Sequence, residues 1–422
     1  MNKVEKTDNS VYHWIIMTIF ATNNQVTMKK DNNHRIYGII GSVIGDIAGS
    51  RFEFVKGFPK KSFKLFGADS SMTDDSVLTI AVADALLHNR TYPDVFWEWG
   101  KNYPAAGFGR SFKKWLKGDK NVQNNSTGDG SGMRIGPVGF RGKTLDEVLR
   151  MAKEATVPTH NSKEGIKAAQ AIATSVFLAR EGKSKAEIKQ YVESKFGYDL
   201  DMTDDDIRGM ADNENYNREL AEVSTPIAIM AFLRGNEYED VIRTAVTYGG
   251  DTDTVACMAG SIAAAFYGVP VELAEQAAYY MPKEALDIIN AFDGTKLCNH
   301  RVTPPTVRRW GTDVVVVYGC NADDTDGEKG FSNTHPNRFS HLPIQKGFPI
   351  HVIGTSMEVV KKDVNDLIAK VKNEPETTFI VENVGLSKKT NIGVDTMAPL
   401  FAPLKDKENV YFVKEYWDYY KK

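Results

Sequence analysis

The sequence is short of cysteine, of long apolar segments and of any excess of one charge, and each shortage excludes a class of protein. Only 3 cysteines occur in 422 residues, too few for a disulfide framework or a four-thiolate zinc site, so we expect a reducing, cytoplasmic environment. The Lys and Arg residues number 52 and the Asp and Glu residues 55, giving a net charge of -3. Without a basic field, general nucleic-acid binding is not expected.

The apolar run at residues 14–17 is too short for a membrane segment, because a spanning helix needs about 20 apolar residues. Residues 23–25 are polar where a signal peptide would have a small-residue cleavage site. We therefore expect no membrane association. Met28 precedes a polar stretch that leads into the first strongly patterned helix. Residues 1–35 are predicted to be an N-terminal extension, disordered or not translated, with Met28 as the alternative start.

Between residues 36 and 300 the apolar residues recur with the period of a helix. Two apolar faces are formed by Leu78, Ala81, Val82 and Ala85 and by Ala169, Ile172, Ala173 and Val176. Two stripes of small residues are formed by Gly41, Gly45 and Gly49 and by Ala256, Gly260 and Ala264. Small residues allow helix axes to approach closely, so the pattern predicts a compact all-α domain over residues 36–300.

The composition changes after a proline-containing linker predicted at residues 301–312. Strands then alternate with helices, which indicates a small α/β domain over 313–422. The predicted strands are 314–318, 351–354, 378–384 and 410–413, and the predicted helices are 357–373 and 396–404. Polar loops after strands are the usual ligand sites of open α/β sheets, which makes Asn333 and His335 loose candidates. Ligand binding, targeting and a purely structural role all remain open for this domain.

Acidic residues cluster directly before two apolar helices of the all-α region, at 73–75 (Thr-Asp-Asp) and 249–254 (Gly-Gly-Asp-Thr-Asp-Thr). Either segment alone is explained by helix capping, because Thr and Asp oxygens accept the unpaired N–H groups of a helix start. Together the acids would repel one another unless a cation neutralised them, and oxygen-only ligands favour Mg²⁺, Mn²⁺ or Ca²⁺ over zinc. A third segment, 45–53, adds Glu53 and Asp46; Asp46 fits equally well a buried structural acid.

These segments, in this order, resemble the motifs of the ADP-ribosylglycohydrolases of the dinitrogenase reductase-activating glycohydrolase type. The family's opening Gly-x-x-x-Gly-Asp-x-x-Gly helix with a loop glutamate is similar to 41–53, and its two acidic motifs are similar to 73–75 and 249–254. Its Gly-Asn-Gly loop before Met-Arg is similar to 128–134, where Asp129 replaces the usual Asn. The ordered set is far more specific than any single motif.

The resemblance implies an all-helical domain that binds two Mg²⁺ or Mn²⁺ ions and acts on an ADP-ribosylated substrate. The implied metal ligands are Thr73, Asp74, Asp75, Asp251, Asp253 and Thr254. The implied catalytic residues are Asp74, Asp253, as the bridge between the ions, and Glu53, as general base or holder of the attacking water. The expected reaction is hydrolysis of the bond between ADP-ribose and a protein side chain, nucleic acid or small molecule, by a water that two ions activate. An ADP-ribose-binding reader with little turnover is the alternative.

Substrate binding is assigned to the glycine-rich loop and to one histidine. The candidates are Gly128, Asp129, Gly130, Ser131, Gly132 and His160. Successive backbone N–H groups of such a loop suit a pyrophosphate, although a flexible surface loop has the same composition. His160 is also explained as a helix cap or a packed imidazole. Phe108, Phe140 and Tyr248 are candidates for stacking on adenine or ribose, against the usual core role of aromatic residues.

Overall fold

The computed structural model describes the chain in several stretches. These are residues 35–53, 55–67, 69–212, 217–298, 314–321, 346–375, 377–386, 390, 392–407 and 409–420. The predicted linker at 301–312, the loop candidates Asn333 and His335 and nearly all of the N-terminal extension lie outside the described residues. Within the described residues, no helix is long and apolar enough to cross a membrane.

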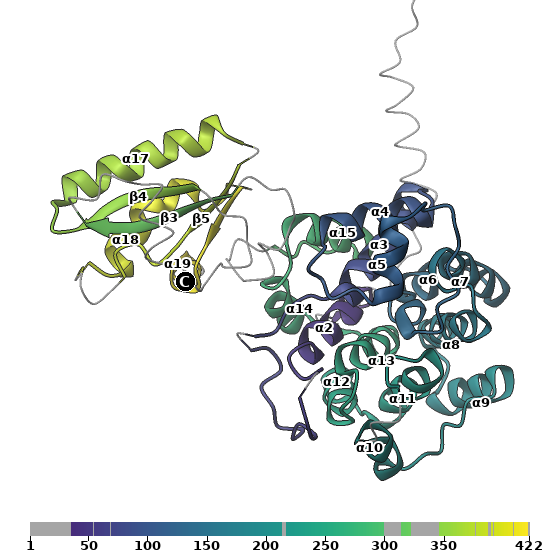
Figure 1. The fold of residues 1–422 in the computed structure, drawn as a ribbon. Coiled ribbons are helices and arrows are strands. Elements are labelled where there is room, and N and C mark those ends of the chain that lie inside the picture. The colour runs from purple at the N-terminus through teal and green to yellow at the C-terminus, as the bar shows by residue number, and fades with distance from the viewer. Residues whose placement is uncertain are drawn as a thin grey trace, which may run out of the picture.

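The first part of the chain is an array of helices, as predicted, and α13 lies among α2, α8, α11 and α12 (Figure 1). The helices are α2 (Ile40–Gly49), α3 (Asp74–His88), α4 (Tyr92–Asn102), α5 (Arg110–Lys117), the 3-10 turn η1 (Asp129–Ser131), α6 (Gly136–Arg141), α7 (Leu145–His160), α8 (Lys163–Arg180), α9 (Lys185–Phe196), α10 (Asp204–Asp212), α11 (Ala221–Arg234), α12 (Tyr238–Thr247), α13 (Thr252–Tyr267), α14 (Val271–Ala278) and α15 (Lys283–Asp293).

Several helices begin at side-chain caps that the sequence supplies, because a Ser or Thr oxygen accepts an unpaired N–H of the first turn. These caps are Thr73, Thr91, Thr144, Ser162 and Ser184. The two apolar faces predicted in α3 and α8 are buried in a core that extends from Ile36 to Leu297. The helical periodicity is therefore confirmed.

Helices α2 and α13 pack with almost no side chain between them, as the two stripes of small residues predicted. The facing pairs are Gly41 with Ala264, Gly45 with Ala256 and Gly49 with Thr252. A Cβ atom added to Gly45 would lie 2.0 Å from the carbonyl oxygen of Ala256. Because the pairs run in opposite directions along the chain, the last turn of α2 lies against the first turn of α13.

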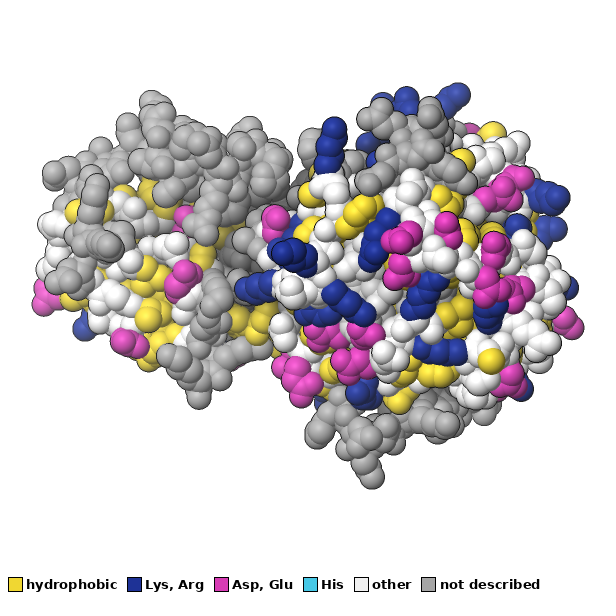
Figure 2. All heavy atoms as spheres, turned by 90° about the horizontal axis from the view of Figure 1, so that it is seen from below, with side chains coloured by type: hydrophobic (Ala, Val, Ile, Leu, Met, Phe, Trp, Pro, Cys, Tyr) yellow, Lys and Arg dark blue, Asp and Glu magenta, His cyan; other side chains and the backbone are white. Residues whose placement is uncertain are grey.

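One detail corrects the all-α description. Two short strands, β1 (Arg35–Ile36) and β2 (Val269–Pro270), form an antiparallel pair at the edge of the helical part. Two residues are too few to produce an alternating apolar pattern, so the sequence carries no local sign of this pair. On the face shown in Figure 2, acidic and basic side chains are interspersed over the helical part.

The C-terminal part contains a four-stranded parallel sheet of order β4-β3-β5-β6 with its own core, which includes Val317 and Val381 of the sheet and Leu367 of α17. The elements are β3 (Val314–Asn321), β4 (Lys346–Ile353), α17 (Met357–Asn373), β5 (Thr378–Val381), α18 (Val394–Phe401), the 3-10 turn η3 (Ala402–Leu404), β6 (Val410–Phe412) and α19 (Lys414–Tyr420). The sheet and α17 bear out the α/β prediction.

Strand β4 begins five residues before the predicted start at residue 351, because Gly347 and Pro349 are poor strand formers and obscure the pattern. Proline is tolerated there because β4 is an edge strand. Strand β5 is shorter than predicted, since the chain turns after Val381, where the N–H of Val384 bonds to the carbonyl of Glu382.

The contact between α2 and α13 predicts the effect of one methyl group. Gly45→Ala is expected to lower the free energy of unfolding by at least about 1–3 kcal/mol, because overpacking forces the two helices apart. The matched control is Gly209→Ala in α10, where an added Cβ meets nothing within 4 Å; it is expected to stabilise by about 0.5–1 kcal/mol. Denaturant unfolding measures both, and equal effects of the two substitutions would contradict the backbone contact.

Candidate functional site

Three helix ends meet at one place. The C-terminal turn of α2, followed by Glu53, lies against the N-terminal turn of α13, and the hydroxyl of Thr252 donates to the carbonyl of Gly49 at 2.9 Å. The N-terminal turn of α3 joins them through Asp46. The predicted convergence of segments 45–53, 73–75 and 249–254 is therefore present in the structure, and two of the three ends are helix N-termini, which favour negative charge.

Asp46 holds α2 and α3 together. Its carboxylate is fully buried and accepts hydrogen bonds from the N–H of Thr73 (2.9 Å), the hydroxyl of Thr73 (2.7 Å), the N–H of Ser76 (3.1 Å) and the hydroxyl of Ser76. These contacts support the interpretation of Asp46 as a buried structural acid. The sequence reasoning missed Ser76, which directly follows the Thr-Asp-Asp motif and supplies two of these four bonds.

The carboxylates form two overlapping groups whose oxygen atoms lie within 4.8 Å of one another. One group is Asp46, Asp75 and Asp253, and the other is Glu53, Asp251 and Asp253. Asp253 belongs to both, which agrees with its predicted bridging position. All the ligand atoms are oxygens, as hard divalent cations require.

Two observations indicate that these groups fit a cation. Oδ1 of Asp75 is buried and has no hydrogen-bond partner among the described residues, and buried polar atoms in native proteins are almost always paired. In the described part of the chain, no Lys or Arg forms an ion pair with Asp75, Asp251 or Asp253. A buried acidic cluster without a basic partner could hold a metal ion, which would neutralise it.

Burial and mutual repulsion raise the pKa values of these acids. Burial, reinforced by the charge of Asp251, raises the pKa of Glu53 to about 7. Burial, reinforced by the charge of Asp46, raises the pKa of Asp74 to about 8. Burial, reinforced most by the charge of Asp251, raises the pKa of Asp253 well above its ordinary value.

The other predicted metal ligands, Thr73, Thr254 and Asp74, have different surroundings. Thr73 caps α3, its oxygen accepting from the N–H of Asp75, and donates its hydroxyl to Asp46. Thr254 is buried beside Asp253, to which its N–H donates at 3.1 Å. Asp74 is in neither carboxylate group among the described residues. Its Oδ1 lies 3.2 Å from the position of a Cβ added to Gly107, so it faces the loop before α5.

The glycine-rich loop at 128–132 is firmly anchored. Backbone hydrogen bonds join Asp129 to Glu219 (3.0 Å) and Ala221 to Thr127 (3.1 Å), and the hydroxyl of Ser131 donates to the carbonyl of Gly165 at 2.8 Å. The N–H groups of Gly128, Asp129 and Gly132 already bond within the protein. The loop therefore has fewer free donors for a pyrophosphate than the sequence suggested, and Ser131 serves to attach it to α8.

His160 lies beside this loop, in surroundings that disfavour its protonated form. A Cβ added to Gly130 would be 3.0 Å from its Nε2. Burial, together with the charge of Arg134, lowers the pKa of His160 well below its ordinary value. Arg134 donates to Oγ1 of Thr159 at 2.6 Å, and this oxygen lies 2.8 Å from Nδ1 of His160.

These contacts favour one tautomer of the imidazole. Because the oxygen of Thr159 already accepts from Arg134, its hydroxyl hydrogen is available to Nδ1 of His160. A neutral imidazole carries one donor and one acceptor nitrogen, so we infer that the proton is on Nε2. His160 then presents an N–H donor to the glycine-rich loop. Sequence reasoning named the histidine but missed Thr159 and Arg134 as the residues that orient it.

The aromatic candidates are core residues instead. Phe108 stacks on Phe112 with ring centroids 4.8 Å apart, Phe140 is buried, and the hydroxyl of Tyr248 bonds to Arg234 and Asp204. All three candidates belong to the helical core. Their burial supports a role in core packing and not in stacking on adenine or ribose.

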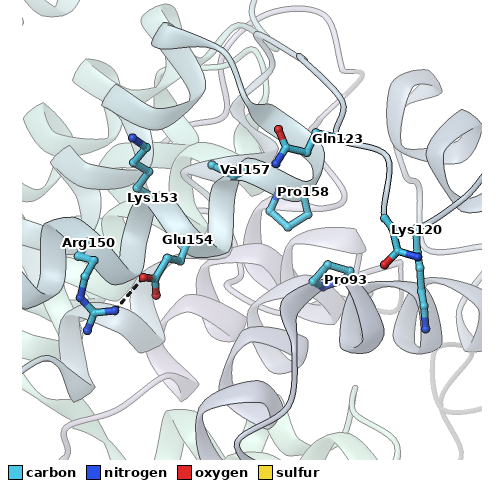
Figure 3. Close-up of a pocket in the computed structure, with 9 residues that line it drawn as sticks. Pro93, Lys120, Gln123, Arg150, Lys153, Glu154, Val157 and Pro158 are labelled. Carbon is cyan, nitrogen blue, oxygen red and sulfur yellow. Dashed lines mark hydrogen bonds and ion pairs between the residues drawn. The ribbon is translucent and has the colours of Figure 1, made fainter.

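A surface cleft of about 520 Å³ lies apart from this cluster. Figure 3 shows that Pro93, Lys120 and Gln123 line one part of it, and that Arg150 and Glu154 of α7 form an ion pair at its wall. None of the predicted catalytic, metal-binding or substrate-binding residues lines this cleft. The chemistry is therefore sought at the acidic cluster and not at this cleft.

The raised pKa values predict how pH and divalent cations act together. Since the folded pKa values of Asp46, Glu53 and Asp74 are about 6, 7 and 8 and the unfolded values are about 4, the stability these acids contribute is present below about pH 4 and is lost as pH rises through about 6 to 8. The Tm of chelator-treated protein should fall over this window, and Mn²⁺ should raise it more at about pH 8 than at about pH 5.

A buried acid elsewhere provides the control. Asp293 caps α2 through the N–H groups of Ile39 and Ile40, and burial raises its pKa to about 7. The part of the fall in Tm with pH that comes from Asp293 should persist when Mn²⁺ is present and should disappear in Asp293→Asn. A cation effect on Tm that is the same at both pH values would contradict the assignment of the cluster.

The Thr159 contact predicts the tautomer of His160. In Thr159→Val the imidazole loses the donor to Nδ1, so a mixture of tautomers should replace the Nε2–H form. Nitrogen-15 chemical shifts of the ring measure this directly. The control is Thr156→Val, one turn earlier in α7, whose hydroxyl bonds only within the helix, to the carbonyl of Ala152. A wild-type spectrum of the Nδ1–H form would refute the inference.

The helical part of the chain is similar to known proteins. The family model described as ADP-ribosylglycohydrolase matches residues 28–296. The chain is 27% identical over 308 residues to ADP-ribosylhydrolase ARH3 of Gallus gallus, covering 54% of this chain and 84% of that protein. It is 24% identical over 271 residues to ADP-ribosylarginine hydrolase Tri1 of Pseudomonas putida (strain GB-1), covering 57% and 73%. Since the matched region is more than half of the chain and contains every acid of the cluster, the protein belongs to the ADP-ribosylglycohydrolase family.

Proposed function

We propose that the helical part hydrolyses the glycosidic bond between ADP-ribose and a modified acceptor, using two divalent ions, Mg²⁺ or Mn²⁺. The observation that carries the proposal is the pair of carboxylate groups that share Asp253 and contain an unpaired buried oxygen on Asp75. The family membership and the names of the relatives, ADP-ribosylhydrolase and ADP-ribosylarginine hydrolase, support the same activity.

The predicted metal ligands are retained in the proposal, with the exception of Asp74. Asp75, Asp251 and Asp253 would hold the ions, with the oxygens of Thr73 and Thr254 beside them. Asp46 orients Thr73 and Ser76 and so fixes the position of Asp75, and Asp74 faces the loop before α5. When bound, divalent ions at such a site neutralise the acids, lower the pKa of a water molecule and polarise ribose hydroxyls.

Glu53 differs from the other acids in its exposure. It lies in the same carboxylate group as Asp251 and Asp253 but is only partly buried, in the loop after α2. A carboxylate that faces both the cluster and the solvent is placed to accept a proton from an attacking water, as a general base. Asp251 and Asp253 lie at the start of α13 and on its first turn, so their positions are fixed.

The substrate would lie between the cluster and the glycine-rich loop. Gly130, in contact with His160, would lie on one side of the bound substrate, and Asp129 and Asp251 on the other. ADP-ribose has hydroxyl groups that acids and cations bind and a pyrophosphate that N–H donors bind. The acceptor group beyond the scissile bond is not specified by these residues, and arginine, serine, nucleic-acid and small-molecule linkages are all retained.

The proposal predicts metal-dependent release of ADP-ribose. Wild-type protein with Mn²⁺ or Mg²⁺ should release it from at least one member of a panel of differently linked substrates, and EDTA should abolish the release. Asp251→Asn combined with Asp253→Asn should reduce the rate by more than the roughly 10–100-fold typical of outer-shell changes at metal sites.

The matched control replaces two exposed acids, Asp201→Asn and Asp205→Asn, whose side chains are 80% and 98% exposed; it should retain the wild-type rate. ADP-ribose binding without turnover in the wild type, whatever the metal, would instead establish the reader. Equal rates with and without EDTA would refute the metal-dependent mechanism.

A further inference from the structure

Asp129 is an acid of the glycine-rich loop whose side chain faces the carboxylate cluster. The residue is 7% exposed, and its carboxyl group lies within hydrogen-bonding reach of the carboxyl group of Asp251. Its Oδ2 is buried and has no hydrogen-bond donor among the described residues. A buried, unpaired oxygen beside a second carboxylate is stable only if a proton or a cation lies between the two groups.

The position of this carboxylate is fixed by the backbone. The N–H of Asp129 donates to the carbonyl of Glu219 at 3.0 Å, and its own carbonyl accepts from Gly132 at 2.7 Å and Met133 at 3.2 Å. The segment before it is joined to α11 through Thr127 and Ala221. Because both flanks are held, the backbone of Asp129 has a fixed position against α11, and its buried side chain extends from there toward Asp251.

No basic side chain compensates for the charge of this pair. In the described part of the chain, neither Asp129 nor Asp251 forms an ion pair with Lys or Arg. One neutral donor, the hydroxyl of Ser224 on α11, lies within reach of Asp129. A single hydroxyl cannot neutralise two carboxylates, whereas a divalent cation neutralises both and is bound by both.

We propose that Asp129 is an additional carboxylate of the metal centre and binds one divalent cation together with Asp251. The proposal rests on the proposed function, because it requires that the cluster binds cations. It assigns Asp129, predicted from sequence as a substrate contact, to the metal side of the loop. The glycine-rich loop then connects the cation directly to the substrate space, because Gly130, the next residue, faces His160.

The test uses the full chain and two isosteric substitutions, Asp129→Asn and, as control, Asp293→Asn. Asp293 is also a buried acid, but it caps α2, and both of its oxygens accept backbone N–H groups. Calorimetric titration with Mn²⁺ gives the affinity, and thermal melting with and without Mn²⁺ gives the stabilisation. Neither measurement depends on turnover.

Two opposite effects are expected in Asp129→Asn. Without metal its Tm should rise, because one of two repelling carboxylates is removed and the amide can donate to Asp251. With Mn²⁺ the increase in Tm should shrink, and the affinity of at least one Mn²⁺ should fall on the order of tenfold. Asp293→Asn should lower the Tm of the metal-free protein, because one backbone N–H loses its acceptor, and should leave the Mn²⁺ affinity unchanged.

The other outcomes each overturn the proposal in a distinct way. Wild-type affinity for Mn²⁺ in Asp129→Asn would mean that the two acids share only a proton. A lower Tm of metal-free Asp129→Asn, or loss of a cooperative transition, would mean that the charge serves a structural role. Absence of Mn²⁺ binding in the wild type would refute the proposed function itself, and this inference would fall with it.

Discussion

The site depends on the direct contact between the backbones of α2 and α13. Gly45 faces the carbonyl of Ala256 with no room for a Cβ atom between them. This contact, and not any interaction among the acids, brings the end of α2 to the start of α13, because the acids repel one another. The hydroxyl of Thr252 adds a hydrogen bond between α13 and α2, and the carboxylate of Asp46 fixes the position of the third helix end, that of α3. The small residues are therefore as necessary to the site as the carboxylates.

The burial of several neighbouring acids disfavours the folding of this part of the chain. Burial disfavours the charged form of each acid, and neighbouring acids add to the effect, so a metal-free chain retains these groups only because the surrounding helices hold them. Asp46 reduces the cost, since four hydrogen bonds stabilise its carboxylate, and the N-termini of α3 and α13 direct positive dipole ends at the cluster. Asp75 has no such compensation at Oδ1. Asp75 and Asp129, each with a buried oxygen that no described donor pairs, are the acids placed best for a cation.

Much of this could be predicted from the sequence because it is local. Helical periodicity located the faces of α3 and α8, the order of the acidic segments located the site, and α17 begins and ends at its predicted residues. The remainder depends on contacts between distant residues. Whether Asp74 or Asp75 turns toward the cluster is decided by how α3 packs, and two consecutive acids carry no sign of it. Asp129 faces Asp251 because its loop bonds to Glu219, about ninety residues further along the chain.

The loop at 128–132 joins two environments of opposite character. On one side Asp129 lies against Asp251 and extends the negative cluster, and on the other Gly130 lies against the neutral Nε2–H of His160. A positively charged histidine would pair with the acids and compete with a cation for them, so the low pKa that burial imposes on His160 keeps the two environments separate. Arg134, buried and bonded to Thr159, adds to this effect, because its charge also lowers the pKa of His160. The two sides of the loop thus differ as the proposed substrate does, with ribose hydroxyls at one end and pyrophosphate oxygens at the other.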